Sequence, residues 1–261
     1  MIDWTAIVLG IIEGITEFLP ISSTGHLLIA EHWLGGRSDT FNIVIQDGAM
    51  LAVTIIYWRR LTTLVVGWQE PENRAYIGKL AVAFLITVVL GFVAKKLGVA
   101  LPETLAPVVW ALIIGGFWMI AAEWFAARQK DRPEVSWTVA IVVGVAQIVA
   151  GIFPGTSRSG ATIFAAMLAG TSNRPAATEF AFLVGIPTMY AASAYELYSQ
   201  FKQGGGHEDW GALATAFVVS AVTAFITVKW LLGYIKSHRY TAFAVYRILL
   251  GAGLLGLAIM K

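Results

Sequence analysis

One polar stretch stands out from an apolar sequence: Glu13-Gly14-Ile15-Thr16-Glu17-Phe18-Leu19-Pro20-Ile21-Ser22-Ser23-Thr24-Gly25-His26. It places two carboxylates, four hydroxyl groups and an imidazole among apolar residues. An ionised side chain at the centre of a membrane helix costs about 2.5–3.5 kcal/mol on insertion scales, so such residues usually serve a function. We therefore interpret residues 13–26 as part of a functional site inside a membrane domain.

The composition supports a membrane protein. Of the 261 residues, 57% are hydrophobic and 13% are charged, and the mean hydropathy is +0.72. Soluble domains carry about 25% charged residues. We expect residues 1–261 to form a single membrane domain. The net charge of +2 is too small to indicate a nucleic-acid partner, and the lack of cysteine excludes disulfides and thiolate metal sites.

Six apolar segments reach the length of about 20 residues that a spanning helix needs. They are residues 41–59, 76–95, 105–127, 176–199, 210–235 and 240–260. Two further apolar segments, 4–19 and 138–153, each run into a polar loop with proline, and the helices expected after them, 23–34 and 159–170, are too short to span. Irregular backbone at membrane depth is tolerated only inside protein or beside a wet cavity. We expect an all-α integral membrane protein with six spanning helices and two re-entrant helix-loop-helix hairpins.

The two hairpins resemble each other at an offset of 134 residues. The matched pairs are Gly10 with Gly144, Glu13 with Gln147, Pro20 with Pro154, Ser22 with Thr156, Ser23 with Ser157 and Gly25 with Ser159. Three spans follow each hairpin, which predicts two repeats, about 1–130 and 135–261. An odd number of crossings in each repeat makes the topology inverted, and such folds place their site near the midplane between the repeats.

Loop charges predict the orientation. One side collects Arg59, Arg60, Arg74, Lys79, Arg128, Lys130, Arg132, Arg174, Lys236 and Arg239, and the other has Arg37, Lys95, Lys96, Lys202 and Lys261. The richer side should be cytoplasmic. Both termini and the entrance to the first hairpin then face the outside, and the second hairpin enters from the cytoplasm.

Glu13 and Glu17 lie one turn apart on a helix, so their carboxylates share one face. Two like charges in an apolar setting either share a proton or bind a cation. Carboxylate oxygens suit Mg²⁺ or Ca²⁺, so we expect one divalent cation on this pair. The alternative is a structural pair that is protonated or hydrogen-bonded to Thr16.

Ser22, Thr24 and Gly25 open the helix after Pro20. Serine or threonine at a helix N-cap is ordinary, but the free N–H groups there also suit a phosphate. The Ser23 hydroxyl is a candidate nucleophile, and His26, about one turn further on, is a candidate general acid or base.

The second loop, residues 154–162, offers a complementary set of groups. Its glycines, hydroxyls and single arginine precede a helix and predict a second anion cradle. The residues expected to bind phosphate here are Thr156, Ser157, Arg158, Ser159, Gly160 and Thr162. A snorkelling arginine is the alternative for Arg158.

These two loops closely resemble the signature motifs of the bacterial undecaprenyl-diphosphate phosphatases, the bacitracin-resistance proteins. The similarity continues through residues 41–60 and 179–198, so it covers essentially the whole chain. It implies an enzyme of the inner membrane that hydrolyses undecaprenyl diphosphate to the monophosphate at the outer face with a divalent cation. This reaction recycles the lipid carrier of peptidoglycan synthesis and confers bacitracin resistance. Asn42 and Asp47 depart from the family pattern outside both motifs; Asp47 is either a local polar contact or a site-lining group.

The resemblance carries the acidic pair onto Glu13 and Glu17, catalysis onto Ser23 and His26, and diphosphate binding onto Arg158. In the mechanism that it implies, Ser23 attacks the terminal phosphorus with help from His26. Direct attack by a water that the cation activates is the alternative. A polyprenyl-phosphate transporter or flippase with the same repeat is the competing function.

Two further features of the C-terminal segment lead to predictions. We expect Arg247 to be structural and to pair with Glu179 or another acid. Gly251, Gly253 and Gly256 form a small-residue face, which makes a homodimer possible.

Overall fold

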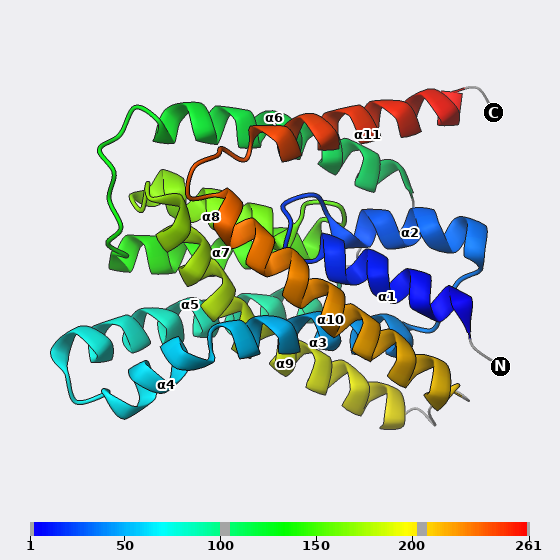
Figure 1. Ribbon diagram of the computed structural model, residues 1–261, viewed down its shortest axis with the longest axis horizontal. Coiled ribbons are helices and arrows are strands. Elements are labelled where there is room, and N and C mark those ends of the chain that lie inside the picture. Colours follow the sequence, from blue (N-terminus) through cyan, green and yellow to red (C-terminus); the bar gives the residue numbers. More distant parts are fainter. Residues whose placement is uncertain (1–2, 100–104, 203–207, 260–261) are drawn as a thin grey trace.

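The structure is a computed structural model that describes residues 3–99, 105–202 and 208–259. This part of the chain is all-helical, without strands, and Figure 1 shows its arrangement. The helices are α1 (Trp4–Thr16), α2 (Ser23–Leu34), α3 (Asp39–Ile56), α4 (Trp58–Val66), α5 (Pro71–Lys96), α6 (Leu105–Ala126), α7 (Trp137–Ile152), α8 (Arg158–Ala169), α9 (Arg174–Lys202), α10 (Trp210–Tyr234) and α11 (Thr241–Ile259).

Each expected apolar segment corresponds to a helix. One further helix, α4, was not expected from the sequence. The segment expected over 41–59 ends at Ile56, and Tyr57, with φ −92° and ψ 9°, separates α3 from α4. This break is set by backbone angles and leaves no mark in the hydropathy.

The chain is a multi-pass helical membrane protein. Within the described residues, four helices are long and apolar enough to cross a membrane: α3, α5, α6 and α10. Helix α9 is longer, at 29 residues, but carries Pro187 and several charges, and the apolar part of α11 runs only over Thr241–Gly256. Length and composition thus confirm four of the six expected spans.

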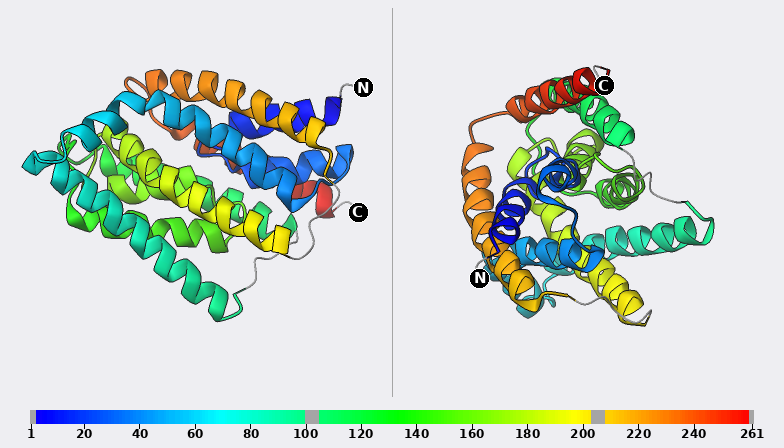
Figure 2. Two further views of the ribbon diagram at one scale, coloured as in Figure 1. Left: turned by 90° about the horizontal axis from the view of Figure 1, so that it is seen from below. Right: turned by 90° about the vertical axis from the view of Figure 1, so that its right-hand side faces the viewer.

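The two short hairpins approach each other from opposite ends of the bundle. Figure 1 shows both termini at the right-hand end, where α1 begins and α2 ends, whereas α7 begins and α8 ends toward the left. Figure 2 shows the same arrangement from two further sides. Helix α1 packs against α10, and α7 packs against α5.

Glycines allow both of these packings to be close. A Cβ added at Gly10 would lie 2.6 Å from the Ala216 carbonyl oxygen, and one at Gly144 would lie 2.7 Å from that of Ala83. Small residues of this kind let backbones of membrane helices approach each other. The first arm of each hairpin is therefore held against a long helix, which positions the loop at its end.

Candidate active site

Ser22 and Ser157 begin the second arms of the two hairpins with the same unusual geometry. They are the non-glycine residues with positive φ in the described part of the chain, at 75° and 64°. The Ser22 hydroxyl accepts a hydrogen bond from the Gly25 N–H over 3.3 Å, and the Ser157 hydroxyl accepts one from the Gly160 N–H over 3.2 Å. Positive φ at such residues is strained and is kept only where the surroundings enforce it.

This geometry corrects the expected alignment of the two loops. Ser22 matches Ser157, at an offset of 135, and not Thr156. The second loop is one residue longer between its proline and its N-cap. Because the extra residue is local, the sequence offset of 134 still holds for the first arms, where Gly10 and Gly144 make equivalent contacts.

The two loops touch each other through side chains. The Ser159 hydroxyl donates to the Leu19 carbonyl over 3.1 Å, and Arg158 Nη2 lies 3.4 Å from Glu17 Oε1. The other terminal nitrogen of Arg158 contacts the Met189 sulfur. The structure therefore brings the two predicted halves of the site together, although they are 141 residues apart in the chain.

Ser23 and Glu17 form the closest polar contact of the first loop. The Ser23 hydroxyl donates to Glu17 Oε2 over 2.6 Å. Both residues are buried, with 9% and 8% of their surface exposed. A hydroxyl bonded to a carboxylate that is in turn held by a third group is the usual arrangement of an activated nucleophile.

The hydrogen bonds of His26 go to groups other than Ser23, so its expected help to Ser23 stays a prediction. Its Nδ1 lies 2.7 Å from the Ser22 carbonyl oxygen and its Nε2 lies 2.7 Å from the Tyr246 hydroxyl. The ring also stacks on Tyr246. Because His26 follows Ser22 by four residues, its imidazole lies over the start of α2. One ring nitrogen therefore contacts the backbone there, and the other contacts Tyr246 on α11.

Glu13 and Gln147 provide oxygens without hydrogen-bond partners. Glu13 is fully buried, and neither of its carboxylate oxygens has a partner among the described residues. The Gln147 amide nitrogen donates to the Thr87 hydroxyl over 2.9 Å, while its Oε1 is buried and unpartnered. A buried carboxylate without partners is costly unless it is protonated or binds a cation.

The donor set fits a Mg²⁺- or Ca²⁺-type site with few protein ligands. No group of three or more acidic, histidine or cysteine side chains is arranged to hold a metal within the described ranges. Mg²⁺ usually takes one or two carboxylates and completes its shell with water and substrate phosphate. Glu13 is free to serve, whereas Glu17 would have to give up a contact with Ser23 or Arg158.

A cavity of about 580 Å³ adjoins the two loops. Of the predicted site residues it is lined by Glu17, Ser22, Ser23, Thr24, Ser157 and Arg158. The other predicted residues do not line it: Glu13, Gly25, His26, Thr156, Ser159, Gly160 and Thr162. The Thr162 hydroxyl, for example, donates to the Arg158 carbonyl over 2.8 Å, so it stabilises the start of α8.

The cavity continues away from the loops between α5, α7 and α9. Its walls there are mainly apolar and include Val88, Phe92, Ile148 and Ala192. Lys95 and Tyr195 also line it, with the Lys95 ammonium 4.3 Å from the centre of the Tyr195 ring. In the sequence, Lys95 counts only as one of the loop charges that predict the orientation in the membrane. Nothing in the sequence places this residue near the two polar loops.

Three side chains outside the motifs have contacts that the sequence did not indicate. Arg247 pairs with no acid in the described part of the chain and donates instead to backbone carbonyls of both loops. The expected partner Glu179 accepts from Arg60 over 3.0 Å. Asp47 accepts from the Ser193 hydroxyl over 2.8 Å and does not line the cavity, so it is a local polar contact.

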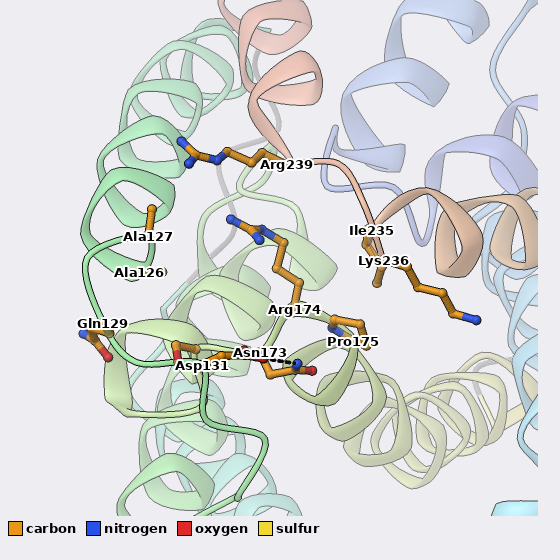
Figure 3. A pocket seen from close by; sticks show the side chains of 11 residues that line it. Ala126, Ala127, Gln129, Asp131, Asn173, Arg174, Pro175, Ile235, Lys236 and Arg239 are labelled. Atoms are coloured by element: carbon orange, nitrogen blue, oxygen red, sulfur yellow. Dashed lines mark hydrogen bonds between the residues drawn. The ribbon is translucent and has the colours of Figure 1, made fainter.

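A second cavity, of about 410 Å³, lies among the ends of helices and contains none of the motif residues. Figure 3 shows Arg174, Lys236 and Arg239 along its lining. Glu123, which is buried behind it, accepts from Arg174 Nη2 over 2.5 Å and from the Tyr240 N–H over 2.9 Å. The Tyr240 hydroxyl lies 2.7 Å from the Thr178 hydroxyl.

Comparisons with known proteins show the family of this chain. The sequence model of the family described as bacitracin resistance protein BacA matches residues 6–253. The chain belongs to this family. A relative from Rhizobium etli (strain CIAT 652), named undecaprenyl-diphosphatase, is 73% identical over 97% of this chain and 96% of its own length. A relative of the same name from Xanthomonas axonopodis pv. citri is 61% identical over 96% of this chain and 95% of its own.

The family match covers nearly the whole chain. The matched region includes both loops, α1 from residue 6 onward, the helices from α2 to α10, and α11 as far as residue 253. The roles of individual residues come from the geometry described above.

Proposed function

We propose that this chain hydrolyses undecaprenyl diphosphate to undecaprenyl phosphate and inorganic phosphate, the activity in the names of its relatives. The observation that carries the proposal is the contact series from Ser23 to Glu17 to Arg158. It supplies a nucleophile, a base within hydrogen-bonding reach and a cation that orients the base. A protein that only bound a phosphate would not need the buried base.

In the first step the Ser23 oxygen attacks the terminal phosphorus while Glu17 takes its proton. The bond from that phosphorus to the bridging oxygen breaks, and undecaprenyl phosphate leaves. Water then cleaves the phosphoserine, which releases phosphate and restores the Ser23 hydroxyl. Arg158 and the N–H groups at the two helix starts stabilise the charge on the phosphoryl oxygens. Direct attack by water is the competing route.

Glu13 and Glu17 would hold a divalent cation, for which Glu17 would give up its contact with Arg158 and keep that with Ser23, and the Gln147 oxygen is a further candidate. The unpartnered oxygens of Glu13 and Gln147 support this assignment. When bound, the cation supplies positive charge that offsets the charge of the diphosphate. Ser22, Thr24 and Ser157 line the cavity, so we assign them to the diphosphate as well.

The apolar part of the cavity would receive the start of the polyprenyl chain. A C₅₅ lipid cannot be enclosed in about 580 Å³, so most of its tail would stay among the membrane lipids. The walls of α5, α7 and α9 suit an apolar chain because they offer few groups that need water.

We further propose that the fold is an inverted repeat with two re-entrant hairpins. In the two halves, α1 corresponds to α7, α3 to α9 and α5 to α10. The packing of α1 on α10 therefore corresponds to that of α7 on α5, and the packing of α3 on α10 corresponds to that of α9 on α5. The equivalent N-caps at Ser22 and Ser157 support the same symmetry. In this topology the protein lies in the bacterial inner membrane, with both termini outside and the site open to the outer face.

Any homodimer would use the open part of the small-residue face of α11. A Cβ at Gly251 would meet Ile113 Cγ1 at 2.6 Å, so this glycine serves packing within the chain. A Cβ at Gly253 or Gly256 would meet no atom within 4 Å.

The test is release of phosphate from undecaprenyl diphosphate by the purified protein in detergent. We expect Ser23→Ala to lower turnover by a factor on the order of 10³ or more, because it removes the nucleophile. Ser193→Ala is the matched control, since its hydroxyl is bound to Asp47 away from the cavity. Label from the terminal phosphate should remain on the wild-type protein after quenching and not on Ser23→Ala. A transporter would release no phosphate at all, and near-normal turnover by Ser23→Ala would exclude the covalent route.

A further inference from the structure

Arg247 is a buried cation that donates to five backbone oxygens, and its Nη1 also lies 4.0 Å from the Met119 sulfur. It lies on α11 with 1% of its surface exposed. Its contacts are Nε to Leu112 O at 3.4 Å, Nη1 to Thr156 O at 3.1 Å and Pro20 O at 3.2 Å, and Nη2 to Ala111 O at 2.8 Å and Gly155 O at 3.0 Å. A guanidinium has five N–H donors, so every donor of Arg247 has a carbonyl.

These carbonyls belong to three separate parts of the chain. Pro20 is in the first loop, Gly155 and Thr156 are in the second loop, and the remaining two carbonyls are on α6. One rigid planar group therefore ties both loops to each other and to a long helix. A lysine offers three donors at one nitrogen and cannot reproduce this fork.

Fixing a carbonyl also fixes the N–H of the next residue. The described part of the chain has no cis peptide bond, and in a trans peptide the N–H points opposite to the C=O. The contact to the Thr156 carbonyl thus turns the Ser157 N–H to the opposite side of the loop. Ser157 is the strained N-cap that lines the cavity.

The space for this guanidinium is reserved by a glycine on α6. A Cβ added at Gly115 would lie 2.3 Å from Arg247 Nη2 and 2.8 Å from Cζ. The neighbouring Gly116 serves a different purpose, because its Cβ would meet Ile248 Cγ1 at 2.6 Å and the Ala244 carbonyl oxygen at 2.9 Å. Helix α6 thus carries one glycine that leaves room for Arg247 and one that allows close packing against α11.

We propose that Arg247 is a positioning residue for the phosphatase reaction: it holds the two loops in the register in which Arg158 of one meets Glu17 of the other. Its fixed charge also adds positive potential behind both loops, where it favours a bound diphosphate. This inference rests on the proposed active site between the loops. Arg247 acts through the loop backbone and need not touch the substrate.

The experiment compares Arg247→Lys and Gly115→Ala with the control Gly116→Ala in the full-length protein. Each variant is measured for kcat and KM of phosphate release, for thermal unfolding, and for hydrogen exchange of the amides in residues 19–25 and 155–160. We expect the first two variants to lower kcat on the order of 100-fold, as small misplacements of reacting groups do. Exchange in both loops should become faster. Gly116→Ala should melt earlier but keep its kcat and its loop protection.

The other outcomes overturn the proposal. If Arg247→Lys or Gly115→Ala has the same kcat as the control Gly116→Ala, the register of the two loops does not need Arg247. A lower kcat with unchanged exchange would show that Arg247 acts in another way. If neither variant folds while Gly116→Ala does, Arg247 holds the fold and does not position the site. Ser23→Ala, measured beside them, separates the two proposals: full activity there would exclude the proposed site, while the exchange data would still test the clamp.

Discussion

The hydroxyl of Ser23 donates a 2.6 Å hydrogen bond to Glu17, and both side chains are buried at the end of the cavity. The two residues are six apart: Glu17 is the C-cap of α1 and Ser23 is the first residue of α2, so the turn between the two arms brings them together. In the mechanism that we propose, this pairing makes Glu17 the base for Ser23 and gives His26 a supporting role.

Glu17→Gln tests the base directly. The amide oxygen can keep the contact with Ser23 but cannot take its proton, so we expect kcat to fall by about 10²–10⁴-fold with a smaller change in KM. Phosphate release under initial-rate conditions measures both constants. Asp47→Asn is the matched control, because it makes the same exchange at a carboxylate that also accepts from a serine. Equal losses in the two variants would contradict the assignment.

His26→Gln and Tyr246→Phe should behave alike. Because His26 bonds the Ser22 carbonyl and the Tyr246 hydroxyl, each change loosens the start of α2 without removing a reacting group. We expect each to lower kcat by about tenfold, the loss of roughly one hydrogen bond. A loss in His26→Gln as large as in Glu17→Gln, with Tyr246→Phe unaffected, would return His26 to the role of base.

Glu13→Gln should separate cation binding from folding. The change removes a buried carboxylate without partners, so the protein without metal should be at least as stable as the wild type. Thermal unfolding with and without Mg²⁺ or Ca²⁺ measures this, and we expect the wild type to gain stability from the cation and the variant to gain little. An unchanged shift of the unfolding temperature in Glu13→Gln would remove Glu13 from the metal site.

Gly151→Leu should test the apolar part of the cavity. A Cβ at Gly151 would meet no atom within 4 Å, and the residue lines the cavity, so leucine fills free volume there. We expect KM for the C₅₅ substrate to rise by about tenfold, which corresponds to about 1.4 kcal/mol. A short-chain diphosphate should be affected less.

Gly233→Leu is the control for this change, since its Cβ also has free space but lies on α10 away from the cavity. Equal effects on short and long substrates, or in both variants, would place the lipid elsewhere.

The sequence predicted most helices within a few residues, because the length of an apolar run and the position of prolines are local properties. The expected segment 210–235 and helix α10 (Trp210–Tyr234) differ by one residue. The break at Tyr57 was missed, since a change of backbone angles between two helices leaves the hydropathy unchanged.

The predictions for the site residues agree with the structure less evenly than the predictions for the helices. Both polar loops were identified, and six of the predicted residues line the cavity. Thr162 and Ser159 were expected to bind phosphate, but their hydroxyls serve the backbone at the start of α8 and the contact between the loops. A hydroxyl in a motif has several possible partners nearby, and residue type alone does not choose among them.

Composition and pattern alone determined that this chain is a helical membrane protein with two polar loops, because apolarity, proline and clustered hydroxyls are visible residue by residue. Only the tertiary structure decided which groups meet. Arg158 reaches Glu17 across 141 residues, and Arg247 reaches the Pro20 carbonyl across 227. A hydrogen bond depends on the distance and direction between two atoms, and for residues so far apart these are set by helix packing.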